Sequence, residues 1–234
     1  MRLCAGLYSL PISPLFSILQ RAPTSAEKMR ILHLDYFMLT PSQSSSLSRI
    51  ILAMTGASGM GYALTLLQAL TQNTQVQTHL IISQAATTVL DLEAGISVRD
   101  LPVDNVWMHD CQDLAAPPAS GSWPHQGMVV CPCSMASLAA INHGFGQNLI
   151  HRAADVTIKE KRPLLLVARE TPLSPVHLRN MLSLAQSGAT ILPACPGFYH
   201  GPKTIQDLIN QLVGRILDHL GLTHSLSPRW GEES

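Results

Sequence analysis

The chain has 234 residues, of which 46% are hydrophobic, enough for the core of one α/β domain with an appendage. Fifteen Lys and Arg against fifteen Asp and Glu leave no formal net charge, so the basic excess typical of nucleic-acid-binding proteins is missing. No apolar run approaches the roughly 20 residues that cross a bilayer, so we expect no membrane partner. The five cysteines are odd in number, which favours reduced thiols in a cytoplasmic protein over a disulfide framework.

Residues 1–48 differ from the rest, because their apolar residues lack steady periodicity and the segment ends in a serine-rich run. Arg2, Arg21 and Arg30 among serines suit a targeting peptide, but Glu27 and Asp35 argue against it. We expect a disordered extension or an over-long start. The folded domain is then predicted over residues 49–223, followed by a C-terminal tail at 224–234.

Strand-like and helix-like segments alternate from residue 48 onward. Apolar runs of strand length occur at 50–54, 78–82, 128–131, 163–168 and 189–192. Helical spacing of apolar residues occurs at 62–70, 84–93, 134–141, 149–161, 176–186 and 204–220. Residues 94–127 hold many turn formers and are predicted as a surface loop with room for one short strand. The alternation predicts an α/β fold with a mostly parallel, doubly wound sheet covered on both faces.

Three loops rich in small, hydroxyl and charged residues follow predicted strands, at the edge where open α/β sheets bind ligands. The first, Thr55–Gly61, supplies a tight turn into a helix, whose N–H groups and Ser58 hydroxyl can hold a phosphate or a flavin edge. A packing turn without a ligand is the competing interpretation. The loop lacks the Lys-Ser or Lys-Thr of a Walker A motif and does not have the Rossmann glycine spacing.

The second loop contains Cys131, Cys133 and Ser134. One residue between the cysteines is short for a zinc pair, and no second cysteine pair or spaced His pair completes a tetrahedral set, so we predict core or loop thiols and no metal. Ser134 and Ser137 open the next helix, which suits either capping or a polar cofactor.

The third loop is Arg169-Glu170-Thr171-Pro172, which follows the apolar run 164–168. A charge pair at the end of a buried strand is expected to be costly unless it meets a ligand or a partner. We therefore expect Arg169 and Glu170 to be functional, and the chain to be an enzyme.

Several linked motifs then identify a family. They are Gly56-Ala57-Ser58-Gly59, Cys131-Pro132-Cys133-Ser134, the run from Asn148 to Val156, Lys159-Glu160-Lys161-Arg162, Arg169-Glu170-Thr171-Pro172-Leu173-Ser174 and Pro196-Gly197-Phe198-Tyr199-His200. In this order they resemble the UbiX-like flavin prenyltransferases, from about Ile50 to Glu232.

The resemblance implies a flavodoxin-like, Rossmann-type three-layer sandwich that assembles as a dodecamer and binds FMN between subunits. It implies transfer of a dimethylallyl group from dimethylallyl phosphate to N5 and then C6 of reduced FMN, without a metal. The prenylated FMN would serve a UbiD-type decarboxylase, in ubiquinone synthesis or in aromatic acid breakdown.

The resemblance also assigns residues. The FMN contacts would be Gly56, Ala57, Ser58, Ser83, Ser134, Met135, Ala136, Ser137 and Arg169. The donor and its phosphate would be bound by Ser120, Arg152, Lys159, Arg169, Tyr199 and Arg215. The catalytic residues would be Glu170, Ser58, Glu93 and Tyr199, with Glu170 assisting phosphate departure or moving a proton.

The proposed roles agree with elementary chemistry. Breaking an allylic C–O bond leaves growing negative charge on phosphate, which Arg, Lys and Tyr donors stabilise most in the transition state. Closing the ring at C6 releases a proton, which Glu170 or the freed phosphate could take.

One departure and two alternatives accompany this assignment. Some relatives carry tryptophan where this chain has Leu114, which changes the aromatic shielding of the prenyl chain. The resemblance therefore does not decide which prenyl donor is preferred. An FMN-dependent cysteine decarboxylase and a non-catalytic FMN carrier are the alternative functions.

Overall fold

The computed structural model describes residues 47–102 and 104–231. Its strands are β1 (Ser48–Met54), β2 (Val76–Ile82), β3 (Val106–His109), β4 (Gly127–Cys133), β5 (Leu164–Ala168) and β6 (Thr190–Ile191). Its α-helices are α2 (Met60–Gln72), α3 (Gln84–Ala94), α4 (Met135–Asn142), α5 (Leu149–Lys159), α6 (Pro175–Gln186) and α7 (Ile205–His219). Every strand and helix predicted from periodicity is present. The extension predicted at 1–48 lies outside the described residues up to position 46, and Ser48 already belongs to β1.

The segment expected to be a surface loop is more ordered than its turn formers suggest. It contains the edge strand β3 and two short 3-10 helices, η2 (Val98–Asp100) and η3 (Pro117–Ala119). Strand β3 pairs with β2, so the short strand for which the sequence left room does form.

The six strands are all parallel and lie in the order β3-β2-β1-β4-β5-β6. Without the edge strand β3, the remaining order is that of flavodoxin-like sheets. The chain moves outward from β1 to β3 and then returns to β4 on the other side of β1. The point where the order reverses therefore lies between β1 and β4, and ligands of open α/β sheets bind outside the carboxyl ends of the strands there.

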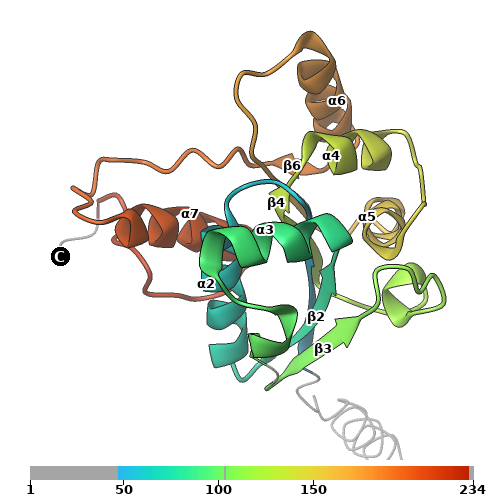
Figure 1. Ribbon diagram of the computed structural model, residues 1–234, viewed down its shortest axis with the longest axis horizontal. Coiled ribbons are helices and arrows are strands. Elements are labelled where there is room, and N and C mark those ends of the chain that lie inside the picture. Colours follow the sequence, from blue (N-terminus) through green and yellow to red (C-terminus); the bar gives the residue numbers. More distant parts are fainter. Residues whose placement is uncertain (1–46, 103, 232–234) are drawn as a thin grey trace, which may run out of the picture. The chain divides into compact units, whose positions relative to one another are not determined.

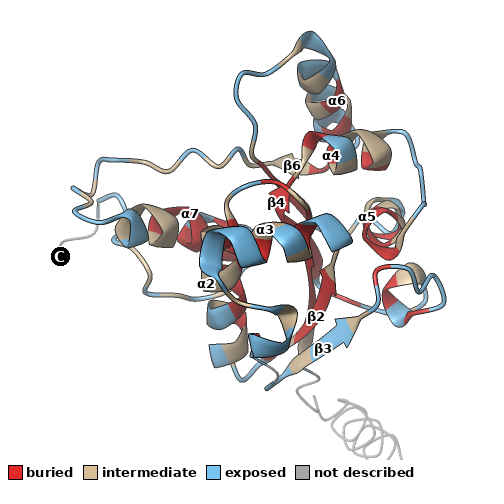
Figure 2. Ribbon diagram, in the orientation of Figure 1, coloured by how far each residue is buried: buried red, intermediate tan, exposed pale blue. Residues whose placement is uncertain are grey.

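Helices cover both faces of the sheet, and β1 shows why (Figure 1). Its residues Ile50, Leu52 and Met54 join a buried cluster with α2, α3 and α7, whereas Ile51 and Ala53 join a second cluster with α4, α5 and α6. Successive side chains of a strand point to opposite faces, so a strand that is apolar throughout fits only between two helical layers. Figure 2 shows the buried residues along the strands and the exposed ones on the outer faces of the helices.

Capping residues define where the last helix begins and where the chain turns back. Thr204 and Asp207 form a reciprocal capping box at the start of α7, and Gly221, with a φ of 69°, follows its end. Residues 222–231, which include most of the expected C-terminal tail, then fold back against α7: Leu222 and Leu226 pack on the core, and Arg229 contacts Asp218.

Candidate active site

The loop after β1 is tied to the loop after β4 by one buried threonine. The Thr55 hydroxyl donates to the carbonyl of Pro132 at 2.7 Å and accepts the backbone N–H of Ser134 at 2.8 Å. Thr55 is 1% exposed, so water does not compete for these bonds. The two loops that flank the reversal of strand order are therefore held together.

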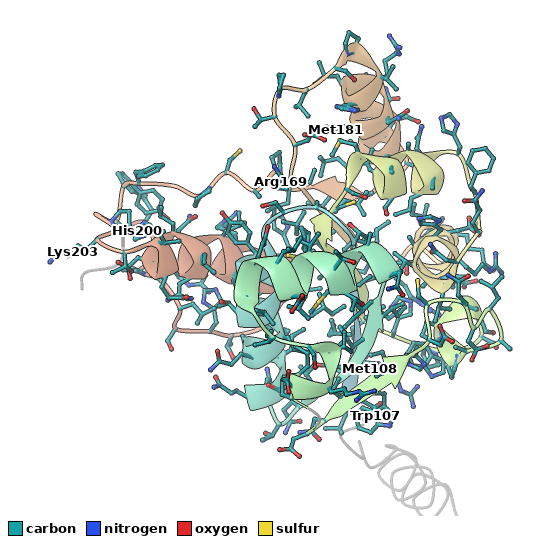
Figure 3. All side chains as sticks on the ribbon, viewed as in Figure 1. Trp107, Met108, Arg169, Met181, His200 and Lys203 are labelled. Atoms are coloured by element: carbon teal, nitrogen blue, oxygen red, sulfur yellow. The ribbon has the colours of Figure 1, made fainter. Side chains whose placement is uncertain are left out.

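Arg169 joins the end of β5 to the same place. Its Nε donates to the carbonyl of Ser58 at 3.0 Å, and its backbone N–H donates to the carbonyl of Cys133 at 3.3 Å. Figure 3 shows Arg169 at the ends of the central strands, above the loop that follows β1. The backbone N–H of Ser83 donates to Met54, which brings the end of β2 to this edge as well. The predicted convergence of the strand-exit loops is confirmed.

The end of α3 caps the start of α2 through Glu93. Its carboxylate accepts the backbone N–H of Met60 at 2.8 Å and that of Gly59 at 3.0 Å. Burial acts to raise the pKa of Glu93. Three hydrogen bonds, from the Ser58 hydroxyl and from those two N–H groups, act in the opposite direction, and so does the positive charge of Arg169. Together these effects exceed the effect of burial, so the pKa of Glu93 is lowered. Glu93 is therefore a carboxylate at neutral pH.

This contact limits the predicted anion site to part of the loop 55–61, because Glu93 already occupies the N–H groups of Gly59 and Met60. The N–H groups of Gly56, Ala57 and Ser58 have no protein acceptor among the described residues. Three such N–H groups at the start of a helix can receive a phosphate or a flavin edge.

Close packing explains the glycine at the start of this loop. A Cβ added to Gly56 would lie 2.5 Å from the Cβ of Ala85, at the start of α3. Ser83 caps the same helix by accepting the N–H of Ala86. Gly56 thus lets the loop and α3 approach each other beside the site.

The first turn of α4 presents hydroxyl groups to this edge. Ser134 caps the helix by accepting the N–H of Ser137 at 3.3 Å, and the two hydroxyl oxygens lie 3.2 Å apart. Met135 is buried and Ala136 is exposed. The N–H groups of this turn can donate hydrogen bonds to a polar ring, and its hydroxyls can both donate to such a ring and accept from it.

The cysteines of the second loop are core residues, as predicted. Cys131 and Cys133 are fully buried, and burial raises the pKa of both thiols, that of Cys133 to about 12. They are protonated at neutral pH and are unsuited to nucleophilic attack.

The expected cost of a charge pair at the end of the buried strand β5 is wrong for the third loop. Arg169 is half-buried, Glu170 is exposed, and they form no ion pair. The Glu170 carboxylate accepts the N–H of Thr171 at 3.1 Å. The chain leaves the sheet directly after Ala168, so both charged groups reach solvent within one chain.

A second group of expected donor-binding residues lies beside η3 and α5. The Nε of Arg152 donates to the carbonyl of Ala119 at 3.2 Å, and Ser120 is one residue further along that turn. Lys159 pairs with Glu160 at 3.1 Å. A Cβ added to Gly121 would lie 3.0 Å from the Lys159 Nζ, so Lys159 also borders this turn.

A third group contains Tyr199 and Arg215. Both line a cavity of about 680 Å³ between α7, the segment before it and the C-terminal residues. The Tyr199 ring meets the Trp230 ring edge to face at 5.3 Å, and Arg215 pairs with Asp218 at 3.0 Å. His200 and Lys203 lie beside the start of α7, away from Arg169 (Figure 3).

Within the described part of one chain, no hydrogen bond or ion pair joins these three groups. Sequence reasoning also missed Asp218, Arg229 and the pairing role of Thr55. The spacing of Arg215 and Asp218, three residues apart on a helix, was the available signal for the ion pair.

The described residues contain no group of three or more His, Cys, Asp or Glu side chains placed to hold a metal ion. None of their helices combines the length and apolarity that a membrane crossing requires.

Comparison with known proteins gives consistent results. The Flavoprotein family model matches residues 38–217. The flavin prenyltransferase UbiX of Pseudomonas aeruginosa is 46% identical over 199 residues, which covers 79% of this chain and 95% of that protein.

Two solved structures share the fold over most of their length. The crystal structure of AnUbiX in complex with FMN and dimethylallyl pyrophosphate has a TM-score of 0.76 and 45% identity, covering 80% of this chain and 99% of that one. The dodecameric FMN-dependent UbiX-like decarboxylase from Escherichia coli O157:H7 has a TM-score of 0.76 and 44% identity, covering 79% of this chain and 100% of that one.

Proposed function

This chain belongs to the Flavoprotein family and, within it, to the UbiX-like flavin prenyltransferases, and we propose that it transfers a dimethylallyl group from dimethylallyl phosphate to N5 and C6 of reduced FMN. The observation that carries the proposal is the meeting of Arg169 with the loop 56–58 where the strand order reverses. The three N–H groups of that loop have no protein acceptor among the described residues, and a guanidinium lies beside them.

The residues around this loop fit an FMN molecule. The loop after β1 offers the N–H groups of Gly56, Ala57 and Ser58, and the first turn of α4 offers the hydroxyls of Ser134 and Ser137. Ser83 and Arg169 lie beside this loop, at the ends of β2 and β5. Exposed Ala136 supplies apolar surface from the same turn of α4, and Met135 lies buried beside it. When bound and reduced, FMN supplies an electron-rich ring that accepts the allyl group. The protein holds that ring in place and keeps it beside the donor.

The donor pocket would be formed by Tyr199 and Arg215, with Ser120, Arg152, Lys159 and Arg169 around the phosphate. Their positive and hydroxyl groups would stabilise the phosphate as the C–O bond breaks and negative charge grows on oxygen. Exposed Glu170 would take the proton released on ring closure, and Glu93 would fix the Ser58 loop.

Because these residues form three separate groups within one chain, we propose that neighbouring copies complete the site. The chain would then act as a homo-oligomer, and the dodecamer of the Escherichia coli relative gives the expected assembly.

A UbiD-type decarboxylase would receive the product. A cytoplasmic location is also proposed, because the four described cysteines are unpaired.

The test is anaerobic incubation of purified protein with reduced FMN and dimethylallyl phosphate, followed by mass spectrometry of the flavin. A flavin heavier by one prenyl unit supports the proposal. Tyr199→Phe and Arg215→Ala should lower the rate of transfer while FMN still binds, and Arg169→Ala should weaken FMN binding. Arg99→Ala, an exposed arginine on η2, is the matched control.

Other outcomes would favour the alternatives. Unmodified flavin that remains bound would indicate an FMN carrier. Decarboxylation of a peptidyl cysteine without any prenyl donor would indicate a cysteine decarboxylase.

A further inference from the structure

The C-terminal segment, residues 222–231, is attached to α7 through His224. The His224 side chain is 6% exposed and packs against Gly214, where an added Cβ would lie 2.7 Å from Cε1 of the ring. The N–H of Leu226 donates to Nδ1 at 3.3 Å. The other ring nitrogen, Nε2, therefore carries the proton of the neutral ring and donates to Asp218 Oδ1 at 3.2 Å. Glycine at 214 is what leaves room for this attachment.

Asp218 connects two arginines that come from different parts of the chain. Its Oδ2 accepts Nη1 of Arg215 at 3.0 Å, one helical turn away on α7. Its Oδ1 accepts Nη2 of Arg229 at 2.8 Å, from the C-terminal segment. Each guanidinium has five N–H groups, and each gives Asp218 only one nitrogen among the described residues. Both arginines thus retain N–H groups for a ligand.

The two arginines line the same cavity. It has a volume of about 680 Å³ and is also lined by Tyr199 and Trp230, whose rings meet edge to face at 5.3 Å. The lining therefore combines two positive groups, a phenol and an indole. This combination suits an organic phosphate with a short apolar chain, because guanidinium groups bind phosphate in a bidentate manner and aromatic rings cover the apolar part.

Stability alone explains this network poorly. The side chains of Arg215 and Arg229 are 55% and 50% exposed, and ion pairs between exposed groups add little to stability. Asp218 nevertheless holds two like charges close together beside a cavity, which favours binding of a doubly charged anion.

We propose that Arg229 is a second phosphate-binding residue of the donor pocket, and that Asp218 is the positioning residue that holds Arg215 and Arg229 toward it. The inference rests on the proposed function and extends it to the C-terminal segment, which thereby becomes part of the donor site. Trp230 would cover the apolar end of the donor from the same segment.

The test is steady-state kinetics with reduced FMN held at saturation and dimethylallyl phosphate varied. Arg229→Ala should raise KM for the donor about tenfold, the effect of losing one charge-assisted hydrogen bond, and leave kcat within about twofold. Arg229→Lys keeps the charge and should recover part of the loss. Asp218→Asn should raise KM as well, because both guanidinium groups lose their anchor. Arg99→Ala should behave as the unaltered protein.

Binding of FMN and the melting temperature are measured for the same variants, because a purely structural role would alter them. Unchanged FMN binding with a raised KM supports the proposal. A KM for Arg229→Ala equal to that of Arg99→Ala overturns it, and so does a loss of FMN binding and melting temperature with KM unchanged.

Failure of the proposed function is seen separately. If the unaltered protein makes no prenylated flavin, the transferase assignment fails. Calorimetric titration with dimethylallyl phosphate then tests Arg229 directly: weaker binding by Arg229→Ala than by Arg99→Ala supports the inference, and equal binding overturns it.

Discussion

The carboxylate of Glu93 accepts the backbone N–H of Met60 at 2.8 Å, so a side chain from the end of α3 caps the start of α2. The same carboxylate accepts the N–H of Gly59, which has a φ of 116°. The loop between these groups carries Ser58, whose carbonyl accepts Arg169. One carboxylate therefore fixes the loop that we propose for FMN.

Replacing Glu93 should cost stability through this cap. Glu93→Ala removes a cap of the kind that contributes about 1 kcal/mol, and Glu93→Gln keeps an acceptor but loses the charge, so it should cost less. Because the pKa of Glu93 is lowered on folding, its contribution is present above the unfolded pKa and is lost as pH falls through the folded pKa. Urea unfolding at pH 7 and pH 4 measures both effects.

The control is Asp91→Ala, an exposed acidic residue on the same helix. It should change stability by no more than about 0.5 kcal/mol. Equal losses for the Glu93 and Asp91 variants would contradict the capping role.

Gly56→Ala should disturb the site by overpacking. The new methyl group would lie 2.5 Å from the Cβ of Ala85, so α3 must move away from the loop. We expect a stability loss of about 1 to 3 kcal/mol and weaker FMN binding. Gly146→Ala is the matched control, because its added Cβ meets nothing within 4 Å. Thermal unfolding and flavin fluorescence titration check both, and a Gly56 variant that binds FMN normally would refute the packing argument.

Much of the fold could be predicted from local patterns. The apolar run that became β1 is buried on both faces, and a strand of that kind has few alternatives to a parallel sheet between helices. The exits of such strands lie at one edge, which is why the loops of Ser58, Ser134 and Arg169 were expected to meet. Apolar periodicity can be read from the sequence, and the alternation of strands and helices predicts the parallel topology.

The contacts that could not be predicted join residues far apart in the chain. Glu93 meets Met60 across 33 positions, and Arg229 meets Asp218 only because the C-terminal segment turns back. The strand β3 was obscured by the turn formers around it, since its pairing with β2 outweighs local propensity. The cost expected for Arg169 and Glu170 at the end of a buried strand was also wrong, because their exposure depends on where the chain leaves the sheet.

Thr55→Val should separate the loops after β1 and β4. Valine has nearly the same shape, but it cannot donate to Pro132 or accept from Ser134. The N–H of Ser134 would lose its partner in a half-buried place, so we expect a stability loss of about 1 to 3 kcal/mol. Thr71→Val, which removes one exposed hydrogen bond to Gln68, is the control and should cost less than about 1 kcal/mol. Denaturant unfolding compares the two, and similar losses would count against the bridging role of Thr55.

A buried histidine in β2 should make the protein sensitive to mild acid. His79 is 5% exposed, and its Nδ1 lies 2.8 Å from His109 Nε2. Its pKa is lowered to about 4, chiefly by burial and then by the positive charge that His109, Arg49 and His125 can carry. In the unfolded chain a histidine titrates near 6.5, so the unfolded state binds more protons between about pH 6.5 and 4. Stability must therefore fall as pH falls through that window.

The size of the effect follows from the shift. One pKa unit corresponds to about 1.4 kcal/mol, so His79 should account for a loss on the order of 3 kcal/mol between pH 6.5 and 4. His79→Phe removes the titrating group, and its stability should depend less steeply on pH even if the variant is less stable at pH 7. His143→Gln, at an exposed position on the C-terminal side of α4, should keep the original slope. Denaturant unfolding at half-unit intervals of pH gives the slopes, and identical slopes for His79→Phe and the unaltered protein would show that His79 is not the group responsible.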